Sequence, residues 1–100
     1  MLIRTVRMTF HPDRLEEFRA LFEEASAQIR AFPGCCLLEL WEDVRFPNIL
    51  TTFSHWESKE ALANYRQSEL FETTWAMTRP LFAAPPEARS QQVIVAVSTA

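Results

Sequence analysis

The spacing of hydrophobic positions changes several times along this chain, and each spacing predicts an element. From Leu2 to Phe10 apolar and polar residues alternate, which is typical of a half-buried strand. From Leu15 to Phe32 apolar residues recur at three- and four-residue steps, which predicts an amphipathic helix. Pro12 suits the first turn of that helix and Pro33-Gly34 ends it. The chain therefore passes from a strand to a helix near residue 11.

The rest of the chain predicts a hairpin, two short helices and a last strand. Ser58 and Ser68 are suitable N-caps for the two helices, the first reaching Tyr65 and the second bent or ended by Pro80. The last strand is expected in a run of mostly β-branched residues that follows a polar connection. The three strands are expected at Cys35–Asp43, Ile49–Trp56 and Val93–Val97.

This order of elements predicts an α+β fold of the ferredoxin-like kind, βαββαβ with the second helix split in two, over a four-stranded antiparallel sheet. The later strands carry apolar residues on both faces, for example Leu38 opposite Leu37 and Leu50 opposite Ile49. Helices cover one face, so the other face needs a partner. A second copy is the simplest one, which predicts a homodimer whose sheets meet.

Composition limits the functions that are open to this chain. One hundred residues, 48% of them apolar, form a single domain over residues 1–100. A net charge of −3 provides no basic surface, so neither nucleic acid nor an anionic membrane is expected as a partner. No apolar run approaches the roughly 20 residues of a membrane span, and no signal segment begins the chain, so a cytoplasmic protein is expected. Cys35 and Cys36 are expected to be core thiols, since neighbours in a strand face opposite ways.

No metal or cofactor is expected from the motifs. Gly34 is the single glycine, which excludes a glycine-rich phosphate loop. The two histidines, His11 and His55, lack carboxylates at ligand spacing, and a metal site needs three or four ligands. Chemistry must then come from aromatic and single polar side chains.

Aromatic residues after the third strand are candidates for a ligand site. Trp56, Tyr65 and Trp75 are either ordinary core or the walls of a cavity between helices and sheet, since Tyr and Trp have polar atoms that seek a partner when buried. His55, beside Trp56, is either a solvated or hydrogen-bonded side chain or a proton acceptor.

Two arginines in the first strand are candidates for a charged role. Arg4 shares its strand face with apolar residues, which is unusual for a cation. Arg4 and Arg7 either form ion pairs at a dimer interface or a strand end, with Glu39 or Glu42 as partners, or stabilise a phenolate or enolate oxygen of a substrate.

Four segments of the chain resemble the antibiotic biosynthesis monooxygenase family: R-T-V-R-M-T-F-H-P-D-R, F-P-G-C, H-W-E-S-K-E-A-L and Y-R-Q-S-E-L-F. The resemblance implies a dimeric α+β barrel of two ferredoxin-like subunits, each with a pocket between sheet and helices. It also implies cofactor-independent oxygenation of an aromatic quinol-like or polyketide-like molecule, whose deprotonated form itself reduces dioxygen. Another branch of the family degrades heme.

Three positions differ from the better-understood branches. Tyr65 stands where quinol-type members often have a His and heme-degrading members a Trp; Leu70 replaces a second His, and Trp75 stands at the axial His of the heme branch. Heme degradation is therefore disfavoured. The resemblance gives His55 the role of base, Arg4 or Arg7 that of anion stabiliser, and the three aromatic residues that of walls. The alternative is a non-catalytic dimeric protein that binds a small aromatic ligand.

Overall fold

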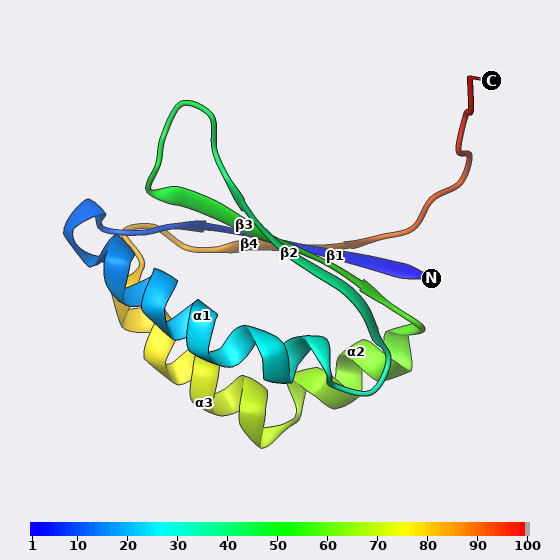
Figure 1. Cartoon of the computed structure of the whole chain (residues 1–100), viewed down its shortest axis with the longest axis horizontal. Coiled ribbons are helices and arrows are strands. Elements are labelled where there is room, and N and C mark those ends of the chain that lie inside the picture. Colours follow the sequence, from blue (N-terminus) through cyan, green and yellow to red (C-terminus); the bar gives the residue numbers. More distant parts are fainter. Residues whose placement is uncertain (100) are drawn as a thin grey trace.

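The computed structural model describes residues 1–99 as a four-stranded antiparallel sheet with all its helices on one face (Figure 1). The strand order is β2-β3-β1-β4, which confirms the predicted ferredoxin-like α+β fold, and the sheet of one chain is open. Within residues 1–99, no helix has the length and apolar character needed to cross a membrane. The elements are β1 (Leu2–Thr9), a 3₁₀ turn (Pro12–Arg14), α1 (Leu15–Arg30), β2 (Cys35–Glu42), β3 (Ile49–Trp56), α2 (Lys59–Arg66), α3 (Glu69–Thr78), a 3₁₀ turn (Arg79–Leu81) and β4 (Glu87–Gln91).

Strand register decides which side chains face the helices. Val6 of β1 pairs with Thr52 of β3, and Met8 pairs with Leu50, so the even-numbered residues of both strands lie on the helix side. The core there has two parts, each formed where a helix packs on the sheet. The buried residues are Met8, Phe10, Phe18, Leu50 and Leu81 in one part and Cys35, Trp56 and Leu62 in the other.

The two predicted serine caps are confirmed. The Ser58 hydroxyl accepts a hydrogen bond from the Ala61 amide at 3.1 Å, and the Ser68 hydroxyl accepts one from the Phe71 amide at 3.1 Å. Each cap satisfies an amide that has no partner within its helix. The caps therefore divide the second helical segment into α2 and α3 at a defined point, and this division sets the angle between them.

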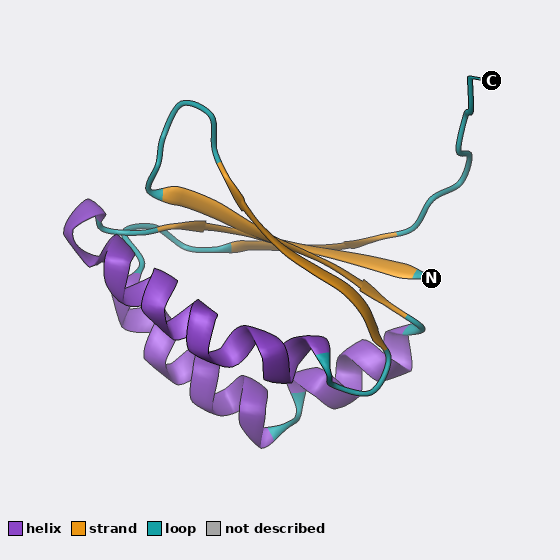
Figure 2. Cartoon of the chain, viewed as in Figure 1, coloured by secondary structure: helices purple, strands orange, loops and turns teal. Residues whose placement is uncertain are grey.

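The last strand differs from the sequence prediction. β4 is Glu87–Gln91, whereas Val93–Val97 form no strand and extend away from the body of the molecule (Figure 2). The register explains this, because Gln91 already pairs with Ile3 and β1 begins at Leu2. Residues after Gln91 thus pass the end of β1, the strand with which β4 pairs. A run of β-branched residues without a neighbouring strand does not form a strand.

The sheet face opposite the helices is open and partly apolar, as predicted. Trp41 and Phe53 stack on this face with ring centroids 4.5 Å apart, and Trp41 is 45% exposed. The apolar tail beyond β4 is also exposed, with Ile94 at 93% and Val97 at 87%.

Candidate functional site

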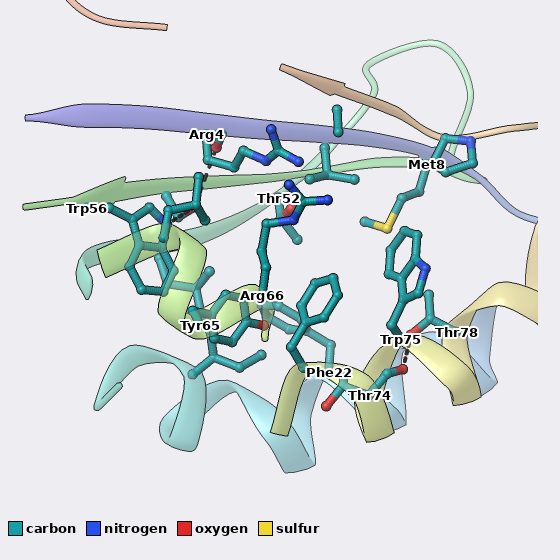
Figure 3. A pocket seen from close by; sticks show the side chains of 18 of the residues that line it. Arg4, Met8, Phe22, Thr52, Trp56, Tyr65, Arg66, Thr74, Trp75 and Thr78 are labelled. Carbon is teal, nitrogen blue, oxygen red and sulfur yellow. Dashed lines mark hydrogen bonds between the residues drawn. The ribbon is translucent and has the colours of Figure 1, made fainter. Parts of the chain in front are cut away.

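A cavity of about 230 Å³ lies between the sheet and the helices (Figure 3). The sheet contributes alternate residues of β1 and β3 to it, and α1, α2 and α3 contribute mostly aromatic and aliphatic side chains. Its principal lining residues are Arg4, Val6, Met8, Thr52, Ser54 and Trp56 from the sheet and Phe22, Tyr65, Arg66, Phe71, Thr74, Trp75 and Thr78 from the helices.

A continuous row of aromatic rings forms one wall. Tyr65 stacks on Trp56 with centroids 5.0 Å apart, meets Phe71 edge-on at 5.3 Å, and Phe71 stacks on Trp75 at 5.8 Å. The wall crosses the break between α2 and α3, so the Ser68 cap positions rings from two helices on one surface. Trp56 is also core, being 1% exposed, and its indole N–H donates to the Ser54 hydroxyl at 3.0 Å.

Tyr65 contributes a neutral phenol to this wall. Burial, and to a lesser extent the nearby Cys35, raises the pKa of Tyr65 to about 12. The phenol therefore keeps its proton at neutral pH and does not act there as a base.

Two cations face the cavity. Arg4 extends along the sheet, where its Nη1 donates to the Ser90 hydroxyl at 2.9 Å, and Arg66 extends from α2 toward Thr52 and the Arg4 guanidinium (Figure 3). Burial lowers the pKa of Arg4, and the positive charge of Arg66 lowers that pKa further, which places the two groups within each other's field.

Sequence reasoning missed Arg66, although a signal for it was present. Arg66 follows the buried Leu62 by four residues, so the two share one face of α2. The face shared with Leu62 is the signal, because the Arg66 side chain itself is exposed.

Four of the six predicted site residues meet at the cavity: Arg4, Trp56, Tyr65 and Trp75. His55 and Arg7 do not line it, because they belong to the other parity of their strands. The His55 ring lies 5.0 Å from the Phe53 ring, and its Nε2 is buried with no hydrogen-bond partner among residues 1–99.

The ion-pair partners expected for the first strand are corrected. Arg7 pairs with Glu87 at 3.4 Å, because β4 lies beside β1 and places Glu87 opposite Arg7. Glu42 instead pairs with Arg19, and Glu39 accepts a hydrogen bond from the Trp41 indole at 2.9 Å.

The charged side chains that line the cavity are all positive. Among the described residues that line the cavity there is no Asp, Glu or His, so neither a carboxylate nor an imidazole balances Arg4 and Arg66. Over residues 1–99, no three His, Cys, Asp or Glu side chains are grouped as a metal site would require. The site can enclose a flat apolar molecule and stabilise negative charge on it.

Known proteins resemble this chain in sequence and in fold. An uncharacterized protein of Synechocystis, sll1783, is 29% identical to this chain over 82 residues. The match covers 82% of this chain and 56% of that protein, so the chain spans little more than half of the length of this relative. A crystal structure described as an antibiotic biosynthesis monooxygenase superposes with a TM-score of 0.89 at 17% identity, covering 95% of this chain and 100% of the other. The structure of Rv0793 from Mycobacterium tuberculosis superposes with a TM-score of 0.87 at 24% identity, covering 97% of this chain and 98% of the other.

The structural likenesses, at these identities, concern the fold alone. The sequence evidence is more specific, because the pattern of the family described as antibiotic biosynthesis monooxygenase matches residues 1–76, which include β1 to α2 and most of α3. The chain therefore belongs to the antibiotic biosynthesis monooxygenase family.

Proposed function

We propose that this protein is a cofactor-independent monooxygenase of a small quinol-like or polyketide-like aromatic molecule, and that its reaction takes place in the cavity beneath the sheet. The observation that carries the proposal is the combination of an aromatic wall, Tyr65, Phe71 and Trp75, with the cation of Arg4. Flat rings pack against the wall, and the guanidinium stabilises an anionic oxygen on them.

The size of the cavity favours a small substrate. Its volume of about 230 Å³ is below the roughly 300–1,000 Å³ of ordinary ligand pockets. A molecule with one or two fused rings fits this space better than a four-ring polyketide does.

The chemistry follows from the anion. A phenolate or enolate is electron-rich enough to reduce dioxygen, so the protein needs to bind it, exclude water and stabilise its charge. For a 1-naphthol the balance is complete without a cofactor: the hydroxyl carbon and the ring C–H carbon para to it become the two C=O groups of a 1,4-naphthoquinone, one oxygen atom of dioxygen enters the product, and the other leaves as water. Arg4 lowers the free energy of the anion, and the lining, which has no group that titrates near neutral pH among the described residues, leaves the proton to solvent.

Oxygen uptake tests this proposal. The purified protein, treated with chelator, is incubated with a panel of hydroquinones and 1-naphthols, with an anthrone as the three-ring comparison, and oxygen uptake is measured above the spontaneous rate. We expect Arg4→Gln to lower kcat by about 10²-fold, as loss of an anion-stabilising donor does. Trp75→Ala is expected to raise KM by removing part of the aromatic wall.

The His55→Ala variant distinguishes a reaction in the cavity from a reaction on the open face of the sheet. His55 lies outside the cavity, so we expect this variant to keep its activity. A fall of about 10²-fold or more in kcat would instead support the role of base that the sequence suggested for His55, would place that chemistry on the open sheet face, and would contradict a cavity site.

One observation favours a second function, which is aromatic binding without turnover. The described lining residues include no proton acceptor that works near neutral pH. Saturable quenching of tryptophan fluorescence by hydroquinones, with no protein-dependent oxygen uptake across the panel, would favour this binding role.

We further propose a homodimer in which two open sheet faces meet. The exposed Trp41–Phe53 stack and the exposed apolar tail both support it, because neither has enough cover within one chain.

A further inference from the structure

Arg4 and Arg66 are charged groups without a counter-ion. Arg4 donates to a neutral hydroxyl, that of Ser90, and neither guanidinium has a carboxylate within ion-pair distance in the described part of the chain. Both project into a cavity whose remaining lining is mainly apolar (Figure 3). Arg4 is partly buried, whereas Arg66 is exposed. Their like charges repel one another, so an anion that binds between them is stabilised by both.

The negative charge has to arrive with the ligand. Arginine remains protonated at any physiological pH, so the two positive charges persist. Tyr65, with its pKa raised to about 12, cannot supply a negative charge at neutral pH. A phenol ionises near pH 10 and is mostly neutral in solution at physiological pH, whereas a carboxylic acid ionises near pH 4 and is already an anion there.

The arrangement of donors also suits a carboxylate. Each guanidinium presents a planar fork of N–H groups that matches the two oxygens of a carboxylate. Arg4 approaches from the sheet and Arg66 from α2, so a carboxylate between them accepts from both sides (Figure 3). The attached rings then lie toward Phe71 and Trp75.

We infer that the ligand of this cavity is an aromatic acid with one or two rings, whose carboxylate lies between Arg4 and Arg66. Arg66 is the residue that gives the site its specificity for an acid over a neutral aromatic. The inference rests on the proposed function only in placing the ligand in the same cavity; it does not require turnover.

Binding of a matched pair of probes tests the inference. Isothermal titration calorimetry under nitrogen compares 1-hydroxy-2-naphthoate with 1-hydroxy-2-naphthamide, which has the same rings and hydroxyl but no charge. We expect the acid to bind at least about tenfold more tightly, as charge-assisted hydrogen bonds imply. Arg66→Gln is expected to remove most of that difference by weakening binding of the acid far more than binding of the amide, while Arg66→Lys keeps part of the difference.

Arg89→Gln is the control for net charge. Arg89 lies in β4 and does not line the cavity, and at physiological salt its charge is screened beyond about 8 Å. We expect this variant to bind both probes as the wild-type protein does. A circular dichroism spectrum unchanged by each substitution shows that the fold is kept.

The outcomes separate this inference from the proposed function. Equal affinity for acid and amide, no binding of either, or an acid affinity unaffected by Arg66→Gln would each overturn the inference, even if hydroquinones were oxidised. A preference for the acid that depends on Arg66 would support the inference even if no oxygen were consumed.

Discussion

Tyr65 is the single tyrosine of this chain, and its surroundings raise the pKa of its phenol to about 12. Trp56 stacks on one side of the ring at 5.0 Å, and Phe32 and Phe71 meet it edge-on at 5.3 Å each. Rings of this kind do not solvate a phenolate, so the neutral form is favoured. The same packing keeps this part of the cavity dry and uncharged for an aromatic ligand.

Tyrosinate absorbance near 295 nm therefore reports Tyr65 alone. We expect the folded protein to titrate with a midpoint about two pH units above that of the protein unfolded in urea, which should lie near pH 10. A folded-state midpoint near pH 10 would contradict the buried position of the ring.

The same pKa shift links stability to alkaline pH. Below about pH 10 the phenol is protonated in both states and contributes no pH dependence. Between about pH 10 and pH 12 the unfolded state releases the proton first, so stability falls as pH rises. We expect Tyr65→Phe to remove this component, up to about 2 kcal/mol, in urea unfolding curves compared with those of the wild-type protein.

At the scale of elements, the turn between α1 and β2 depends on Gly34. Its φ is +90°, and a Cβ built there would lie 2.4 Å from the Cβ of Ala61 in α2. Gly34 thus permits both the left-handed turn and the close approach of α2 to the start of β2. The Glu57 amide donates to the Gly34 carbonyl at 2.8 Å, which fixes this approach.

Gly34→Ala should therefore be strongly destabilising. We expect a loss of about 2 kcal/mol or more, from backbone strain at positive φ together with the steric conflict. In the double variant with Ala61→Gly the conflict is removed and the strain remains, so part of the loss should be recovered. Ala63→Gly, at an exposed position of α2, measures the helix-propensity cost of the second substitution. Strictly additive losses in urea unfolding would contradict the predicted contact.

Much of this fold could be predicted from local patterns, because most elements carry both periodicity and a start or stop signal. The strand β4 could not. Its sequence, E-A-R-S-Q, is polar and exposed throughout, and only its position beside β1 makes it a strand. Val93–Val97 have the stronger local preference but lie beyond the end of β1. Tertiary pairing therefore overrides propensity at this edge of the sheet.

The candidate site likewise has residues that the sequence could predict and others that it could not. The parity of Arg4 in β1 indicates a cation among apolar residues but not which sheet face it occupies, and the aromatic residues of α2 and α3 are candidates from their types alone. His55 and Trp56 are neighbours in β3, and neighbouring side chains in a strand point to opposite faces of the sheet. Because Trp56 is buried on the helix side, His55 must lie on the open face. Arg66 approaches Arg4 only through the packing of α2 on the sheet, which the sequence does not specify.

At the scale of the whole molecule, two apolar surfaces lack cover from residues 1–99 of the same chain. The first is the open sheet face around Trp41 and Phe53, and the second is the tail of residues 93–97, with Val93 at 63% and Val95 at 72% exposure. The tail leaves the sheet at the edge formed by β4 and projects past the body of the subunit (Figure 1). A second copy packed against the open face covers the first surface and offers the tail a strand partner that its own chain lacks.

Light scattering coupled to size-exclusion chromatography tests the homodimer, for which we expect about twice the chain mass of 11.6 kDa at micromolar concentration. A stable contact of this kind should bury roughly 2,000 Å², so a charge at its centre should be poorly tolerated. Trp41→Glu is expected to shift the equilibrium toward monomer, whereas Met77→Glu, on the helix side of the molecule and 55% exposed, adds the same charge and should not. Truncation after Gln92 should weaken the dimer by removing the tail while leaving β4 paired with β1. If the wild-type protein stays at 11.6 kDa at micromolar concentration, the sheet-to-sheet homodimer is wrong, whatever the cavity binds.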